Sequence, residues 1–487
     1  MPRRKMHVTD ADGSPLRAAL RRLREDTGVT EDFPAAALAE AEQAARQPRL
    51  PAHDATDLPL FTIDPPGAKD LDQAMYLERR RGGGFRVHYA IADVAAFVRP
   101  GQALDAETHR RAMTLYYPDG RVPLHPGVLG EGAASLLPDH DRPALLWRFD
   151  LDADGRVTAT GVRRALVRSR ARLDYAGVQH AIDTGIAEEP LALLRDIGLR
   201  REALERARGG ISLNVPEQEI VRRDGHYELA YRAPLPADGW NAQVSLMTGM
   251  AAADLMLRSG TGILRTLPAA SERAVERLRR VAAALGVTWP EDMPYGAVIR
   301  ALDPSRPRHA AFLQECTALL RGAGYTVFDR ERPTERPVPA DPGHAALAAP
   351  YTHCTAPLRR LVDRYTGELC LAAARGAGPP EWVRAALDAL PGEMETGARR
   401  AGRVERECVD LVEAALLRDR IGQVFDAYVV DVQEDRPTAG TVHLYEPAVI
   451  GHVEGDRDGP LLAAGHRMRV RVIEAAPGRD KVWFTPA

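Results

Sequence analysis

The sequence predicts an α+β protein, because strand-like and helix-like patterns come in separate blocks along the chain. Two helical patterns come first, short strand-like runs begin at about residue 57, long helical patterns dominate from about 190 to 420, and short strands return near the C-terminus. We expect a mixed sheet with surrounding helices over 57–420, between a helical N-terminal domain over 1–50 and a small β-barrel over 422–487.

Composition indicates an ordinary globular chain. Of the 487 residues, 45% are hydrophobic and 27% charged, and the formal net charge of −3 means that nucleic-acid binding must depend on local basic patches. No apolar run approaches 18 residues, so we expect no membrane span. The four cysteines form no CxxC pair, which favours a reducing, cytoplasmic location without a zinc site or disulfides.

The first 50 residues have the pattern of two helices. Leu16, Leu20 and Leu23 line one face of the first helix, which Gly28 can end, and an alanine-rich second helix ends near Arg46. The pair is either a helix-turn-helix that binds DNA or RNA, or a plain packing element.

The large middle block begins with a predicted hairpin and continues with helices. A strand over 74–77 and another over 85–98 flank the loop Gly82-Gly83-Gly84. The helical patterns cover about 190–210, 240–258, 270–285, 309–322, 357–375 and 380–420.

The last 65 residues have the pattern of short strands separated by Gly, Pro and Asp turns. These strands cover 424–432, 441–444, 448–453, 468–473 and 482–484. Five short strands predict a small closed barrel of the OB type, with a β-sandwich as the alternative.

Three aspartates form the sharpest local feature. Asp64, Asp70 and Asp72 surround the turn Pro65-Pro66-Gly67, which cannot be helical. Asp70 and Asp72 project to one side of an extended backbone, and Asp64 can fold back to meet them. Converging carboxylates repel one another unless a cation lies between them, and hard oxygen ligands favour Mg²⁺ or Mn²⁺. The alternative, a solvated Asp-rich loop, is less consistent with the apolar strand that follows directly.

The segment Thr62–Ala74, TIDPPGAKDLDQA, resembles the catalytic signature of the ribonuclease II/R exoribonuclease family, approximately TIDP-x-x-AKD-x-DDA. Further segments resemble the motifs of this family in the same order. They are HYAIADV with Leu104-Asp105, TLYYP with VPLHP, Ser135-Leu136, YTHCTAPLRR at 351–360 and Val404-Glu405-Arg406. The resemblance spans residues 57–420 and implies an RNB-type catalytic domain, followed by an S1-like OB barrel that binds RNA.

The chain departs from the family pattern at two places. Gln73 stands where the family has a fourth aspartate, so a neutral amide replaces a carboxylate. Asn241, Gln243 and Ser245 lie where the family has paired glutamates on a central helix. The chain is therefore a divergent relative.

The resemblance implies roles for the acidic cluster and for Arg359. Asp64, Asp70 and Asp72 would bind Mg²⁺, with Gln73 as a fourth ligand through its carbonyl oxygen. Asp72 would lie nearest the attacking water. The planar fork of Arg359 would bind the phosphate, while its neighbour Arg360 would point elsewhere, with a role nearer to structure than to RNA contact.

The resemblance also implies residues that bind RNA. Tyr116 and Tyr175 match positions where the family stacks bases on tyrosines, although Tyr175 is about equally well explained as a buried core residue. Leu213 falls where relatives often have an aromatic base clamp, and would weaken it. Glu405 would accept a hydrogen bond from the terminal ribose 2′-hydroxyl.

The predicted function is a Mg²⁺-dependent, processive 3′-to-5′ exoribonuclease that releases nucleoside 5′-monophosphates. Its substrates would be single-stranded 3′ ends. Relatives usually have two cold-shock barrels before the catalytic domain, and the 56 preceding residues leave no room for them, so we expect structured RNA with short 3′ overhangs to be degraded too. No feature indicates an obligate protein partner. The alternatives are a catalytically inactive RNA-binding relative and a metal-dependent DNA phosphodiesterase.

Overall fold

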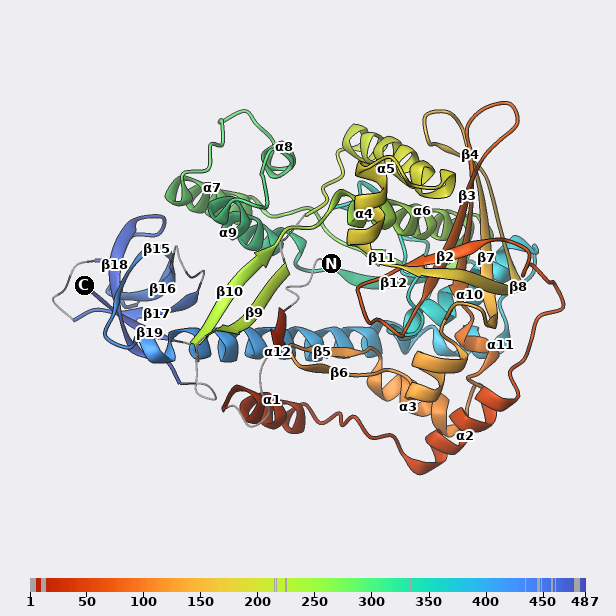
Figure 1. Cartoon of the computed structure of the whole chain (residues 1–487), viewed down its shortest axis with the longest axis horizontal. Coiled ribbons are helices and arrows are strands. Elements are labelled where there is room, and N and C mark those ends of the chain that lie inside the picture. The colour runs from red at the N-terminus through yellow and green to blue at the C-terminus, as the bar shows by residue number, and fades with distance from the viewer. Residues whose placement is uncertain are drawn as a thin grey trace.

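The structure is a computed structural model that describes most of the chain. The described residues are 6–487 apart from 10–14, 214, 216, 224–225, 333, 434, 445–446, 448, 457–458, 460 and 477–481. Figure 1 shows an elongated molecule with one β-barrel towards each end and helices between them.

The predicted mixed sheet of the large domain closes into a five-stranded barrel. Its strands are β2 (Leu60–Ile63), β3 (Gln73–Arg79), β4 (Phe85–Ala92), β7 (Asp141–Leu151) and β8 (Val157–Leu173). All neighbours are antiparallel except β2 and β8, whose parallel pairing closes the barrel. Large side chains such as Tyr89 and Trp147 pack in one core cluster and small ones such as Ala90 and Ala144 in another.

The β3–β4 hairpin was predicted correctly, but its second strand is shorter than expected. β4 ends at Ala92, and a 3-10 turn over Val94–Ala96 follows, instead of a strand that continues to Val98. The amides of Ala96 and Phe97 bond the carbonyls of Asp93 and Val94, so the backbone leaves the sheet. The α3 helix (Ala103–Arg111) and the hairpin of β5 (Leu115–Tyr117) and β6 (Gly120–Val122) come next.

In the described part of the chain after residue 174, nine α-helices follow this first barrel. They are α4 (Tyr175–Asp183), α5 (Glu189–Arg208), α6 (Pro236–Ser259), α7 (Glu272–Leu285), α8 (Tyr295–Arg300), α9 (Pro307–Cys316), α10 (Leu361–Ala374), α11 (Glu381–Ala386) and α12 (Leu390–Leu417). α5 packs on β3 and α10 on β8, while α12 contacts β5 and runs along the long axis of the molecule (Figure 1).

Two small strand pairs complete this region. β11 (Thr261–Thr266) pairs with β12 (Gly324–Asp329), and β13 (Gly343–His344) pairs with β14 (Ala349–Pro350).

The two N-terminal helices form where the sequence predicts them, but they pack on different parts of the large domain. The α1 helix (Pro15–Asp26) lies against α12, and α2 (Ala35–Arg46) lies against α3. The leucines of α1 and the alanines of α2 belong to two different core clusters. The helices therefore have no common core of their own, which differs from a helix-turn-helix, in which the two helices pack on each other.

A short strand joins the N-terminus to the middle of the chain. β1 (Met6–Thr9) pairs in parallel with β9 (Glu217–Arg223), which also pairs with β10 (His226–Arg232). The sequence pattern did not indicate this three-stranded sheet.

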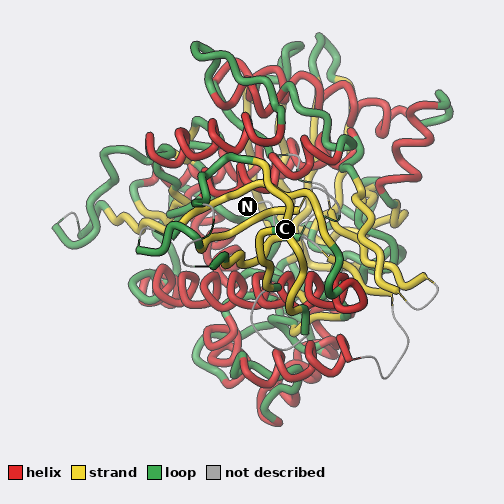
Figure 2. The backbone as a smooth tube through the Cα atoms, turned by 90° about the vertical axis from the view of Figure 1, so that its left-hand side faces the viewer, coloured by secondary structure: helices red, strands yellow, loops and turns green. Residues whose placement is uncertain are grey.

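The C-terminal barrel confirms the OB-type prediction. β15 (Val424–Val432), β16 (Ala439–Leu444), β17 (Ile450–Glu454), β18 (Arg467–Glu474) and β19 (Trp483–Pro486) close in the order 15-16-17-19-18. Figure 2 looks at the molecule from the end that carries this barrel. Its third strand was predicted to start at Ala448, which lies outside the described residues.

The C-terminal barrel is packed onto the helices beside it. Tyr428 and Val430 of β15 belong to the core cluster formed by α7, α8 and α9. The Arg467 side chain also donates through Nε to the carbonyl of Ala284, 3.3 Å away, in the last turn of α7. The barrel therefore shares a core with the rest of the chain.

All four cysteines are buried and unpaired. Among the described residues, no helix is both long and apolar enough to cross a membrane.

Candidate active site

The loop over 64–72 is fixed at the edge of the barrel formed by β2, β3, β4, β7 and β8. The Asp64 amide donates to the carbonyl of Leu173 (3.1 Å), at the end of β8. The Ser135 hydroxyl accepts from the Leu71 amide and donates to the Lys69 carbonyl, at 2.9 and 2.6 Å. These bonds hold the aspartates in a defined arrangement, which a solvated loop would lack.

Asp72 is the most deeply placed carboxylate of the cluster. It is 5% exposed, its Oδ1 accepts a hydrogen bond from the Leu358 amide (2.8 Å), and its Oδ2 lies 3.5 Å from Nε of Arg359. Burial raises the pKa of Asp72 to about 7, although Arg359 opposes the rise. The negative charge of Asp72 therefore depends on a cation nearby.

Asp64 lies close to the same arginine. Burial raises its pKa to about 6, while the charges of Arg359 and Arg172 lower it. Its Oδ2 atom is buried and has no hydrogen-bond partner. A buried carboxylate oxygen without a partner is an unusual and costly arrangement that a bound cation would relieve.

Asp70 is held by an arginine that the sequence analysis did not single out. Nη1 of Arg121 lies 2.5 Å from Oδ1 of Asp70, and Nη2 lies 2.6 Å from Oε1 of Glu131. Arg121 is on β6, directly opposite Tyr116 on β5. In the sequence, Arg121 is marked only by its position as a charged residue between the motifs TLYYP and VPLHP.

Gln73 lies beside the cluster, but its side chain is engaged elsewhere. The Tyr89 hydroxyl donates to its carbonyl oxygen, and its amide donates to the Thr355 carbonyl, both at 2.6 Å. In this arrangement Gln73 ties β3 to β4 and to the segment before Arg359. The Gln73 carbonyl oxygen already accepts a hydrogen bond from Tyr89. To act as a metal ligand, it would have to use its second lone pair.

Arg359 and Arg360 are neighbours in the segment over 351–360, but their side chains contact different groups. Arg359 lies beside Asp72, and Arg360 pairs with Asp363. The Arg359 side chain is 44% exposed. Arg360 donates through Nε and Nη2 to the Asp363 carboxylate, at 2.8 and 2.7 Å, next to the start of α10. The structural role expected for Arg360 fits this pairing, and its predicted contribution to RNA binding stays a prediction.

Both tyrosines lie near the charged groups of the cluster. Tyr116 is 42% exposed, and Arg359, Asp70 and Asp72 are its charged neighbours. The Tyr175 hydroxyl accepts a hydrogen bond from Asn241 (3.1 Å), and Asp64 and Arg359 are its charged neighbours. Tyr175 is half-buried and packs against the main core cluster, which agrees with its alternative interpretation as a core residue. Tyr116 is therefore the tyrosine whose ring is exposed at the site.

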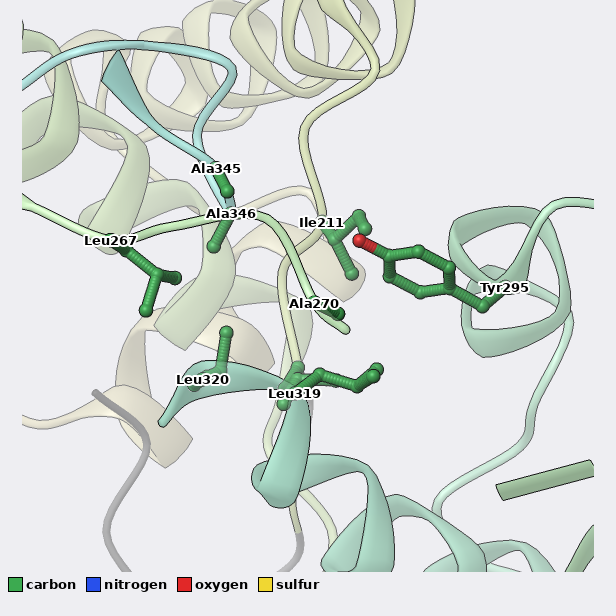
Figure 3. Close-up of a pocket in the computed structure, with 9 residues that line it drawn as sticks. Ile211, Leu267, Ala270, Tyr295, Leu319, Leu320, Ala345 and Ala346 are labelled. Carbon is green, nitrogen blue, oxygen red and sulfur yellow. The ribbon is translucent and has the colours of Figure 1, made fainter. Parts of the chain in front are cut away.

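The remaining two predicted residues are Glu405 and Leu213. Glu405 is half-buried on α12, the helix that packs on β5. Leu213 lines an apolar pocket far along the chain from the aspartates, with the residues drawn in Figure 3. This pocket is built from aliphatic side chains and Tyr295, so the structure does not place Leu213 as a base clamp.

The donor chemistry of the cluster fits a hard divalent cation, but the present geometry does not enclose one. Nowhere in the described part of the chain do three acidic, histidine or cysteine side chains gather so as to hold a metal ion. The ion pairs explain this, because Asp70 is turned to Arg121 and Asp72 to Arg359 and the Leu358 amide. Asp64, Asp70 and Asp72 would hold the cation, and the unpartnered oxygen of Asp64 supports that assignment.

The site combines groups that bind different parts of a nucleic-acid strand. An exposed arginine can bind its phosphates, tyrosine rings can stack on its bases, and carboxylates can hold a cation beside the phosphodiester. The fold and the site therefore indicate a protein of the nucleic-acid-processing class. Two family models match: the RNB domain over residues 52–374 and the RNase II-type exonuclease C-terminal S1 domain over 423–487. The chain belongs to the RNB family, which confirms the resemblance of its motifs.

Relatives and solved structures agree with this assignment. The chain is 28% identical to Ribonuclease R of Escherichia coli strain K12 over 489 residues, covering 91% of this chain and 58% of that protein. It is 28% identical over 342 residues to the Arabidopsis thaliana exosome complex exonuclease RRP44 homolog A, covering 66% and 35%. The chain thus spans less than two thirds of these relatives.

Solved structures share the fold at lower identity. RNase R of Mycoplasma genitalium, in complex with ribose-methylated single-stranded RNA, has a TM-score of 0.81 at 18% identity and covers 98% of this chain and 79% of its own. Yeast Ssd1, a pseudonuclease, has a TM-score of 0.69 at 15% identity, with coverage of 91% and 56%. The fold is therefore common to nucleases and to a pseudonuclease.

Proposed function

We propose that the protein is a Mg²⁺-dependent exoribonuclease that degrades RNA processively from the 3′ end to nucleoside 5′-monophosphates. The observation that carries the proposal is the contact between the two motifs. The Leu358 amide donates to Asp72, and Arg359 lies beside the same carboxylate. An acidic cation site and a phosphate-binding arginine thus meet at one point.

Each group has a role in hydrolysis that its position supports. A divalent cation bound there would lower the pKa of the attacking water and stabilise the charge on the leaving oxygen. Asp64, Asp70 and Asp72 would bind that cation, with Asp72 nearest the water. Arg359 would bind the scissile phosphate through its fork of N–H donors.

The tyrosines would grip the strand on each side of the bond. Base stacking on an aromatic ring contributes about 1–3 kcal/mol for each base and does not depend on sequence. The exposed ring of Tyr116 is suited to this. Tyr175, held through its hydroxyl by Asn241, would offer its ring from the other side.

The inactive RNA-binding relative remains the second candidate, because one observation favours it. Gln73 replaces the fourth aspartate of the family, and its amide is committed to Tyr89 and Thr355. The cluster therefore has one ligand fewer than the family pattern. The third candidate, a DNA phosphodiesterase, would use the same carboxylates and arginine.

One assay separates the three candidates. RNA and DNA of equal sequence, each prepared with a 5′ label and, separately, with a label in the 3′-terminal nucleotide, are incubated with Mg²⁺ or with EDTA. Metal-dependent shortening of the 5′-labelled RNA alone, with the 3′ label released as a mononucleotide, supports the proposal. Binding without shortening selects the inactive relative, and shortening of DNA selects the phosphodiesterase. A chase with unlabelled RNA tests processivity.

A further inference from the structure

Arg121 places a fixed positive charge inside the carboxylate cluster. Its guanidinium lies between Asp70 and Glu131, with N···O distances of 2.5 and 2.6 Å, and its side chain is 25% exposed. The hairpin of β5 and β6 fixes its position, because Arg121 is the cross-strand partner of Tyr116. The same hairpin therefore presents both a ring and a guanidinium to the cluster.

Three arginines already act on the carboxylates of the site. Arg121 pairs with Asp70 and Glu131, Arg359 lies 3.5 Å from Asp72, and the charges of Arg359 and Arg172 act on Asp64. These four acidic and three arginine side chains leave one formal negative charge, and Gln73 adds none. A first divalent cation already exceeds this charge, so a second is strongly disfavoured.

Phosphodiester cleavage commonly uses two divalent cations about 3.5–4 Å apart, which stabilise the attacking and the leaving oxygen. We propose that Arg121 takes the place of one of these two cations, so that the cluster binds a single divalent cation. This rests on the proposed function, since it assigns the cation content of the same site. The guanidinium engages Oδ1 of Asp70 and so keeps that oxygen from a second ion, while Asp64, Asp72 and the other oxygen of Asp70 remain for the first.

The experiment counts bound ions and does not depend on turnover. Mn²⁺ is titrated into the full chain, and free Mn²⁺ is followed by electron paramagnetic resonance, for the unmodified protein, Arg121→Gln, Arg121→Lys and Arg86→Gln. Arg86 is the matched control, because it pairs with a carboxylate outside the cluster, Asp150 (2.7 Å). Circular dichroism and thermal unfolding check that each variant is folded.

We expect one Mn²⁺ for the unmodified protein, for Arg121→Lys, which keeps the charge, and for Arg86→Gln. We expect two for Arg121→Gln, which frees Asp70 and Glu131. Two ions in the unmodified protein would overturn the inference, whether or not Arg121→Gln folds, and so would one ion in a folded Arg121→Gln. If the unmodified protein binds no Mn²⁺, metal-dependent hydrolysis itself is wrong, and that failure is distinct from a wrong count.

Discussion

The Asp72 carboxylate both accepts a backbone hydrogen bond and carries a negative charge, and a substitution by asparagine removes only the charge. Its Oδ1 accepts the Leu358 amide, which an asparagine carbonyl can also do, while its charge faces Arg359. We expect Asp72→Asn to lower RNA hydrolysis at least about 100-fold, because a cation ligand is lost, while RNA affinity is kept or rises. Single-turnover rates and filter binding measure the two quantities.

The unfolding temperature is the control for Asp72→Asn. Replacing a buried charge by a neutral amide removes a desolvation cost, so the variant should be at least as thermostable as the unmodified protein. Hydrolysis at more than about a tenth of the normal rate would contradict the assigned role of Asp72.

His125 makes the stability of the site depend on pH. It is buried, its Nε2 bonds the Pro357 carbonyl at 3.2 Å, and burial lowers its pKa from 6.5 to about 4. The unfolded chain therefore binds a proton that the native protein does not. The stabilisation is fully present above pH 6.5 and is lost as the pH falls through about 4, and it amounts to on the order of 3 kcal/mol.

The variant His125→Gln tests this dependence. Its amide can still donate to Pro357 but does not titrate in this range, so the variant should lose less stability than the unmodified protein on acidification. Urea unfolding at several pH values between 7 and 4 measures the difference. Parallel curves for the two proteins would show that His125 does not carry the effect.

The residue scale also shows what the sequence could and could not predict of the site. Asp64, Asp70, Asp72 and Arg359 were predicted from their motifs, and the structure brings them together. Arg121 was missed, because its partner Asp70 lies about 50 residues away and only the folded hairpin joins them. The apolar pocket around Leu213 could not be predicted, because it is lined by residues from distant parts of the chain, such as Leu267 and Leu319.

At the scale of elements, the packing of α6 positions the segment that carries Arg359. The carbonyl of Gly249 accepts from the Thr352 amide at 3.2 Å. A Cβ atom at Gly249 would lie 2.6 Å from the Thr352 carbonyl oxygen and would also overlap the Tyr351 ring. The helix and the segment can approach each other this closely only because residue 249 has no side chain.

Gly249→Ala should therefore displace the segment over 351–360 and reduce hydrolysis about tenfold or more, with a loss of about 1–3 kcal/mol in unfolding free energy. Gly392→Ala is the matched control, because a Cβ atom there would meet nothing within 4 Å and Gly392 also lies in a helix. The control should be neutral or stabilised by up to about 1 kcal/mol. Equal behaviour of the two variants would contradict the positioning role of Gly249.

The elements that the sequence predicted well are those with a clear period or clear turns. The helices over 190–210 and 270–285 and the strand over 424–432 are found within a few residues of the prediction. β7 and β8 were not identified, because arginines alternate with apolar residues along β8 and obscure the strand pattern. The closure of the sheet depends on the parallel contact of β2 with β8, and no local pattern can show such a contact.

At the scale of the whole molecule, the C-terminal barrel places an arginine row on its outer surface. Arg467, Arg469 and Arg471 alternate with Met468, Val470 and Val472 along β18, and all three arginines are exposed. Arg467 bonds to α7, outside the barrel, whereas Arg471 donates through Nη1 to the carbonyl of Gly422, beside β15. We therefore expect Arg469, and Arg471 through its other N–H groups, to contact RNA phosphates.

The double variant Arg469→Ala/Arg471→Ala should weaken RNA binding at low salt. Each phosphate contact with a single strand contributes about 0.7 to the slope of log affinity against log salt concentration, so the slope should fall by roughly 1.4. Arg399→Ala is the control, since Arg399 is equally exposed but lies on α12 and pairs with Glu395. Fluorescence anisotropy with single-stranded RNA measures both, and an unchanged slope would exclude the row from the binding surface.

The distance along the chain between the two halves of the site has a consequence for how the protein is made. Asp72 and Leu358 are 286 residues apart, and the loop that carries Asp72 is fixed only when Leu173, at the end of β8, has been added. Chains emerge from the ribosome N-terminus first and fold domain by domain. A nascent chain therefore displays its acidic loop for most of translation without the arginine that completes it. If the proposed hydrolysis requires Arg359, the growing polypeptide is inactive on RNA until that residue has emerged and folded.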